Sequence, residues 1–158
     1  MRTVRLAVFS LALVILSIGR PSLAAPNPPE EISFTVVLPA GVACSFDVEA
    51  SITGKDKVID LPGERFIFIA PKLFVTLTNL EDPSKQVTLN ATGSIQDTIN
   101  PDGSIVSVLR GRSVLTDPVT AGLVLVIGNF SYVSDAEWNI IQPIEGQGQI
   151  IDICPMID

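Results

Sequence analysis

The sequence predicts an all-β protein: a single antiparallel β-sandwich or β-barrel of about ten short strands, closed by one disulfide. Apolar and polar residues alternate with a period of two in many short runs, and turn-forming residues separate the runs at about 8–12-residue spacing. No run shows the apolar stripe of an amphipathic helix. Alternation does not distinguish a sandwich from a barrel, so both architectures stay open.

The N-terminus has the pattern of a cleavable signal peptide. Arg2 and Arg5 precede an apolar run over residues 6–19, and the small residues Ser22 and Ala24 follow Pro21. The run of 14 residues is shorter than the ~20 that a membrane-spanning helix needs. We therefore expect residues 1–24 to be removed on export, which makes the protein secreted and leaves no transmembrane segment in the mature chain.

The next seven residues, 25–31, form a polar, proline-rich tail, and a single β-domain is predicted over residues 32–158. The chain has two cysteines, Cys44 and Cys154. An even number of cysteines in an exported chain indicates a disulfide, and only one pairing exists. No C-x-x-C spacing is present, so a redox or metal-binding thiol pair is the weaker interpretation.

The clearest strand covers residues 43–52, where one set of alternate residues is apolar and the other polar. The apolar set is Cys44, Phe46, Val48, Ala50 and Ile52. Other predicted strands include residues 32–37, 57–61, 64–70, 72–78, 94–99, 104–110 and 123–127. Residues 79–84 and 100–103 predict tight loops, because they contain proline, aspartate, asparagine or glycine at turn positions.

Composition excludes several kinds of chemistry. The chain has no histidine, which removes the Ser-His-Asp and Cys-His nucleophile systems and the common histidine-rich metal sites. Loss of residues 1–24 removes three arginines and no acid, so the net charge moves from −7 to −10. This acidic balance makes nucleic acid a poor partner and favours solubility as the role of the charge.

One group of residues offers a candidate for catalysis. Asp135, Glu137 and Glu145 lie near the single tryptophan, Trp138, and paired carboxylates beside an aromatic ring are typical of glycoside hydrolases. The alternative, which we favour, is that these carboxylates are solvated and that the tryptophan is a core or rim residue. No catalytic residue, cofactor or metal site is therefore assigned.

Three further features have two interpretations each. The segment Asn100–Gly103 carries oxygen ligands for calcium, but a turn needs the same residues. Asn90 and Asn129 begin N-x-[ST] glycosylation sequons, which matter only in a host that uses them. Abundant phenylalanine, isoleucine and valine predict either a packed core, which we favour, or a barrel that holds a small apolar ligand.

The chain resembles uncharacterised exported all-β domain proteins of bacteria, of an actinobacterial type. The resemblance rests on SFDVEASITGK after Cys44, on LFVTLTNLED, VTLNATGSI, NPDGSI and RGRSVL, and on the closing IIDIC. It implies a fold and a compartment and no activity. We expect a non-catalytic binding or structural module with a cell-surface or protein partner; the alternatives are an apolar-ligand carrier and a carboxylate-based glycoside hydrolase.

Overall fold

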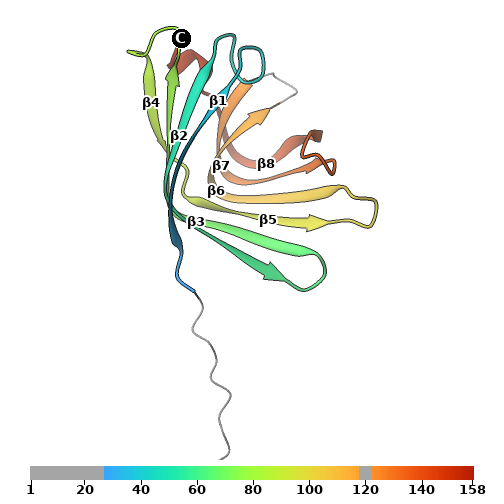
Figure 1. Ribbon diagram of the computed structural model, residues 1–158. Helices are drawn as coiled ribbons and strands as arrows, with labels where there is room; N and C mark the ends of the chain where they lie inside the picture. The colour runs from blue at the N-terminus through green and yellow to red at the C-terminus, as the bar shows by residue number, and fades with distance from the viewer. Residues whose placement is uncertain (1–26, 118–121) are drawn as a thin grey trace, which may run out of the picture.

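The structure, a computed structural model, describes residues 27–117 and 122–158. The predicted signal peptide and the start of the tail lie outside the described residues. Figure 1 shows an all-β molecule with one short 3-10 turn, η1. The elements are β1 (Glu30–Leu38), β2 (Val48–Leu61), β3 (Arg65–Asn79), β4 (Gln86–Asn90), β5 (Gly93–Ile99), β6 (Ile105–Asp117), β7 (Gly122–Ser134), β8 (Ile140–Asp152) and η1 (Cys154–Met156).

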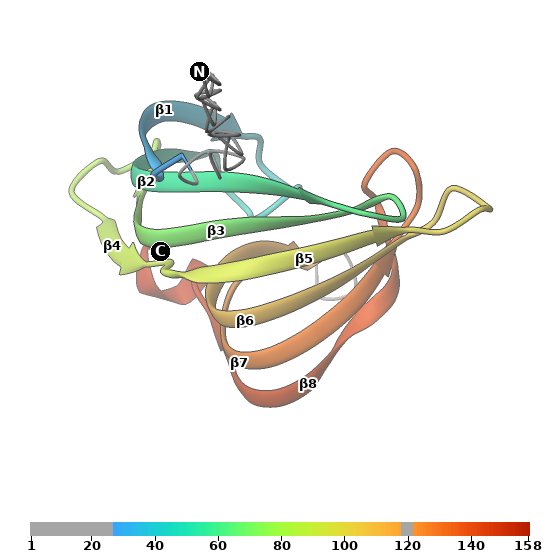
Figure 2. The same ribbon diagram turned by 90° about the horizontal axis from the view of Figure 1, so that it is seen from below.

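All strands belong to one antiparallel sheet, which confirms the predicted class. The strand order is β1-β2-β3-β5-β6-β7-β8, and β4 pairs with β3 beside this path. The two outermost strands, β1 and β8, do not pair with each other, so the sheet stays open. The molecule is thus one strongly bent sheet, which neither closes into a barrel nor divides into two separate sheets (Figures 1 and 2).

The strands are fewer and longer than the alternation predicts, because several predicted breaks lie inside continuous strands. The predicted strands 64–70 and 72–78 are halves of β3, whose first half pairs with β5 and whose second half pairs with β4. Pro71 lies where the partner changes and has no paired residue, a position that tolerates proline. Near the N-terminus, β1 begins at Glu30, so the last two residues of the predicted tail, Glu30 and Glu31, belong to this strand.

A row of small residues crosses the sheet at the middle of the long strands. Ala70 pairs with Gly93, Gly93 with Gly111, Gly111 with Gly128, and Gly128 with Gly148. A Cβ at Gly93 would lie 2.7 Å from the carbonyl oxygen of Arg110, and one at Gly111 would lie 2.9 Å from that of Thr92. Neighbouring backbones therefore approach too closely along this row, the glycine crease, for larger side chains. The strands β6, β7 and β8 curve strongly (Figure 2).

Two apolar clusters stabilise the bent sheet. The larger joins residues of β2, β3, β4 and β7 to the loop that follows β1, and includes the fully buried Val48 and Leu77. The smaller joins Leu109 and Phe130 to Val124 and Val126. Because Val126 and Phe130 lie on either side of Gly128 in β7, the smaller cluster spans the glycine crease.

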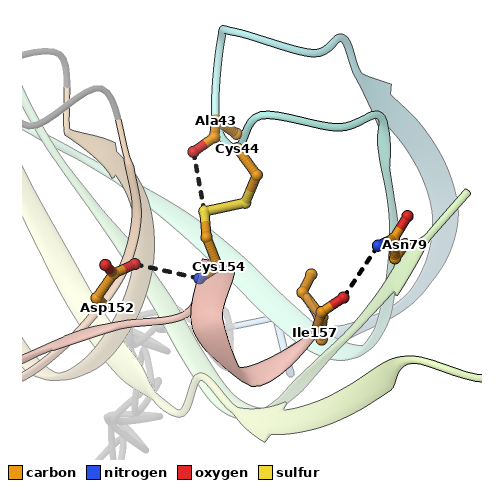
Figure 3. Close-up of a disulfide and its surroundings, with 6 residues drawn as sticks. All are labelled: Ala43, Cys44, Asn79, Asp152, Cys154 and Ile157. Atoms are coloured by element: carbon orange, nitrogen blue, oxygen red, sulfur yellow. Dashed lines mark hydrogen bonds between the residues drawn. A yellow bond between two sulfur atoms is a disulfide. The ribbon is translucent and has the colours of Figure 1, made fainter. Parts of the chain in front are cut away.

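The predicted disulfide between Cys44 and Cys154 is present, with a Cα–Cα distance of 5.6 Å (Figure 3). Cys44 lies in the loop before β2, whereas the alternation places it on a strand; it is buried all the same. Cys154 opens η1, two residues after β8 ends at Asp152. Near η1, Ile153 and Ile157 are fully buried, and the Asn79 side-chain amide donates to the Ile157 carbonyl at 3.1 Å. The disulfide therefore ties together the segments next to the two open edges of the sheet.

Candidate functional site

Asp135, the first of the predicted carboxylates, organises a turn. Its Oδ1 accepts hydrogen bonds from the backbone N–H of Glu137 at 3.0 Å and of Asn139 at 2.8 Å, and the Asn139 side-chain amide donates to Oδ2 at 2.9 Å. The Asn139 side chain and the backbone donors hold the pKa of Asp135 below its ordinary value. A general acid needs a raised pKa, so the environment of Asp135 opposes that role.

Trp138 lies in the same turn with a positive φ of 68° and a half-exposed side chain. Its ring meets Phe66 edge to face, with 6.3 Å between the ring centroids. Glu137 is exposed in this turn, and Glu145 lies on β8, where it borders a shallow hollow of about 190 Å³. Asp135, Glu137 and Trp138 do not line that hollow. Of the three candidate carboxylates, only Glu145 lies at this hollow. The structure therefore does not bring two of them together there, as a glycoside hydrolase would need.

The other predicted features have local roles. Asp102 accepts hydrogen bonds from the Ser104 hydroxyl at 2.7 Å and the Ser104 N–H at 3.0 Å, which lowers its pKa and shapes the turn between β5 and β6. Within residues 27–117 and 122–158, no group of three or more histidine, cysteine or acidic side chains could hold a metal ion. The sequon residues Asn90 and Asn129 are both exposed.

An apolar hollow of about 270 Å³ lies between β1 and the middle of the sheet. Its lining is mainly aliphatic and aromatic, with Asp56, Ser94 and Ser113 as the polar members. The apolar members are Ile32, Phe34, Ile52, Phe68, Ala70, Leu73, Val75, Ala91, Ile95 and Val114. This hollow brings together side chains of β1 and of β6, which lie far apart in the sequence, and the sheet order creates this juxtaposition.

A second apolar hollow, of about 320 Å³, adjoins the first. The two share Ile52, Val75 and Val114, and the second extends to Leu38 of β1 and Leu123 of β7. Together they form an apolar groove between β1–β3 on one wall and β6–β7 on the other, which we name the seam groove. The groove has the edge strand β1 on one side, and no residue of β8 lines either hollow.

Two inward-pointing side chains of β1 are exposed: Phe34, which lines the seam groove, and Val36, which lines neither of its hollows. Phe34 pairs with Ile52 and Val36 pairs with Ala50, so they share the face that carries the larger cluster. Phe34 is nevertheless 51% exposed and Val36 is 42% exposed. A closed barrel would cover both side chains, and here nothing among the described strands does so.

A buried polar chain lies away from the groove. Asp97, Ser107 and Tyr132 occupy one row across β5, β6 and β7. Asp97 is 4% exposed and accepts a hydrogen bond from the Ser107 hydroxyl at 2.6 Å. Burial raises the pKa of Asp97, while the Ser107 hydrogen bond opposes that rise. Burial also raises the pKa of Tyr132. The chain does not open into a hollow through Asp97, which makes it a structural element of the core.

Sequence reasoning missed both the seam groove and the buried polar chain. A signal for the polar chain exists in the sequence. Asp97 is two residues from both Ile95 and Ile99, and residues at this spacing in a strand lie on the same face. A signal for the groove does not exist, because strand order decides which residues face each other.

No helix in the described part of the chain is long and apolar enough to cross a membrane. Comparison with models of protein families finds no match, and comparisons with curated proteins and with solved structures find none either.

Proposed function

We propose that the protein is an exported, non-catalytic binding module that holds a small apolar ligand in the seam groove. The main support is the exposure of inward-pointing Phe34 and Val36 beside two adjoining apolar hollows. Binding pockets are mostly apolar, carry a few polar groups that orient the ligand, and measure about 300–1,000 Å³. Asp56, Ser94 and Ser113 supply such polar groups at one end of the groove.

Export is supported by the signal-like N-terminus and by the Cys44–Cys154 disulfide, since disulfides persist in oxidising compartments. The absence of histidine and the turn-forming role of Asp135 favour binding over catalysis. A ligand carrier and a surface binding module would both use the seam groove, because both need an accessible apolar surface.

Two measurements test the proposal. Native mass spectrometry of the mature protein purified from its own host should show added mass from a bound ligand. The stripped protein should then bind the fluorescent apolar probe anilinonaphthalene sulfonate with saturation. Phe34→Ala removes part of the groove wall, and we expect its dissociation constant for the probe to rise about tenfold, which corresponds to 1.4 kcal/mol.

The matched control is Ile141→Ala, which removes a side chain of similar exposure, 58%, from the opposite edge strand. Ile141 lines neither hollow of the groove, so its variant should bind the probe as the wild type does. An unliganded mass together with unsaturable probe binding would overturn the proposal, and so would equal losses in the two variants.

A further inference from the structure

We infer that two copies of this chain associate through β1, pairing antiparallel about a two-fold axis so that the two sheets become continuous. The inference concerns the outer edge of β1 and goes beyond the proposed ligand site. Among the described strands β1 has a neighbour, β2, on one side only. Its other side therefore presents backbone N–H and C=O groups that a further strand can pair with.

The edge of β1 lacks the features that keep edge strands apart. Residues 32–38, ISFTVVL, contain no charge, proline or glycine and are rich in β-branched and aromatic residues. Phe34, Val36 and Val37 are 51%, 42% and 53% exposed, so both faces of the strand carry uncovered apolar surface. Such an edge is a template for pairing with a second chain.

The opposite edge, β8, is protected. Pro143 lies within it without a paired residue, and the pairing of β8 with β7 is irregular on both sides of Val133. Gly146 and Gly148 add positions with positive φ in which other residues are strained. Pairing of β1 with β8 of another copy would continue without limit, whereas β1 with β1 closes as a dimer. Because β8 is protected and β1 is not, edge pairing through β1 favours a dimer over a fibre.

Charge selects the antiparallel orientation. The acidic residues of β1, Glu30 and Glu31, both lie at its start. Parallel pairing would place like charges side by side, which is destabilising. In the antiparallel register that sets Phe34 opposite Val36 of the second copy, Glu31 lies opposite Pro39 of the second copy. The two Glu31 residues are then eight residues apart, about 27 Å at the rise of a strand.

The same register keeps inward-pointing residues together. Ile32, Phe34, Val36 and Leu38 of one copy lie beside Leu38, Val36, Phe34 and Ile32 of the other, so the apolar wall of each seam groove continues into the second copy. Thr35 lies at the two-fold axis opposite its own equivalent. Its side chain bonds to Ser51 on the outer face and lines neither hollow of the groove.

The test uses sedimentation velocity of the mature, disulfide-bonded protein. The wild type should show a concentration-dependent dimer at up to about 100 μM, a range that captures micromolar dissociation constants. Thr35→Lys places two like charges opposite each other at the axis, and we expect the dissociation constant to rise at least tenfold. The matched control, Gln149→Lys, adds the same charge to exposed β8 and should leave the dimer unchanged.

Each outcome decides the inference. A wild-type monomer over the whole range, or a dimer that Thr35→Lys leaves intact, overturns it. Larger assemblies that Gln149→Lys dissolves also overturn it, because they would require β8. Since Thr35 lies outside the groove, Thr35→Lys should still bind anilinonaphthalene sulfonate like the wild type. The loss of the dimer and the loss of the ligand site can therefore be told apart.

Discussion

Substitution of glycines by alanine separates two reasons why a position requires glycine. One is a close approach of a neighbouring backbone, and the other is a positive φ. At Gly93 a Cβ would lie 2.7 Å from the Arg110 carbonyl oxygen and 2.8 Å from that of Arg112. Ordinary contact begins near 3.4 Å, so β6 must move by about 0.7 Å, the difference between 3.4 and 2.7 Å. Overpacking of this kind costs about 1–3 kcal/mol, which we expect as the loss of unfolding free energy in Gly93→Ala.

Gly41 supplies the matched control. Its φ of 83° disfavours other residues, but a Cβ there would meet nothing within 4 Å. Gly41→Ala should therefore lose only the cost of left-handed backbone, about 1–2 kcal/mol. Gly128 combines both effects, since its φ is 141° and a Cβ would overlap the Gln147 carbonyl oxygen. Gly128→Ala should lose about 2–5 kcal/mol, the range spanned by the two effects acting together.

Urea unfolding followed by far-UV circular dichroism measures all three variants, with the slope against urea as the test that each unfolds like the wild type. The expected order of destabilisation places Gly128→Ala above both Gly93→Ala and Gly41→Ala. If Gly128→Ala costs no more than Gly41→Ala, the strands are free to separate along the row, and the crease is not the tight backbone contact that we describe.

Three further predictions concern the core and the disulfide. Because burial raises the pKa of Asp97 in the folded state, its contribution to stability falls as the pH rises from about 4 towards neutral. Asp97→Asn removes this contribution, so the difference in unfolding free energy between variant and wild type should change with pH in urea unfolding across this range; a constant difference contradicts the prediction. Ser107→Ala should cost about 1–3 kcal/mol, since Asp97 loses its hydrogen bond; thermal and urea unfolding of the variant would show a smaller loss if the hydroxyl is dispensable. Cys44→Ala/Cys154→Ala should lose up to about 4.8 kcal/mol, the loop entropy for a separation of 110 residues, and unreduced, denatured wild type should show no free thiol on labelling.

The sequence predicts the class of this fold well because alternation, turns and cysteine count are local or countable properties. The Asn100–Gly103 turn forms as expected, with the Gly103 N–H donating to the Asn100 carbonyl at 2.9 Å. Strand boundaries are less predictable. Pro71 indicates a break, but a change of pairing partner lets β3 continue through it. Likewise, the row from Gly93 to Gly148 is visible only after the register is known.

The candidate site shows where sequence reasoning ends. Phe34 lies on the face of its pairing partner Ile52, and a normal core would bury it there. Phe34 is exposed on an edge strand, and strand order is a non-local property that no single strand encodes. Asp135, in contrast, looks chemically promising in sequence, yet its hydrogen bonds to Glu137 and Asn139 make it a turn residue.

The disulfide and the open edge are two parts of one arrangement. Cys44 follows β1 and Cys154 follows β8, so the bond fixes the distance between the two edges at one end without pairing them. The glycine crease crosses the strands from β3 to β8, where neighbouring backbones approach closely. A groove held at its end by a covalent bond and along its length by a creased sheet is preformed, and preformed sites lose little conformational entropy on binding. The disulfide and the creased sheet thereby hold the apolar lining of the groove in one arrangement, which supports the proposal that the groove binds a ligand.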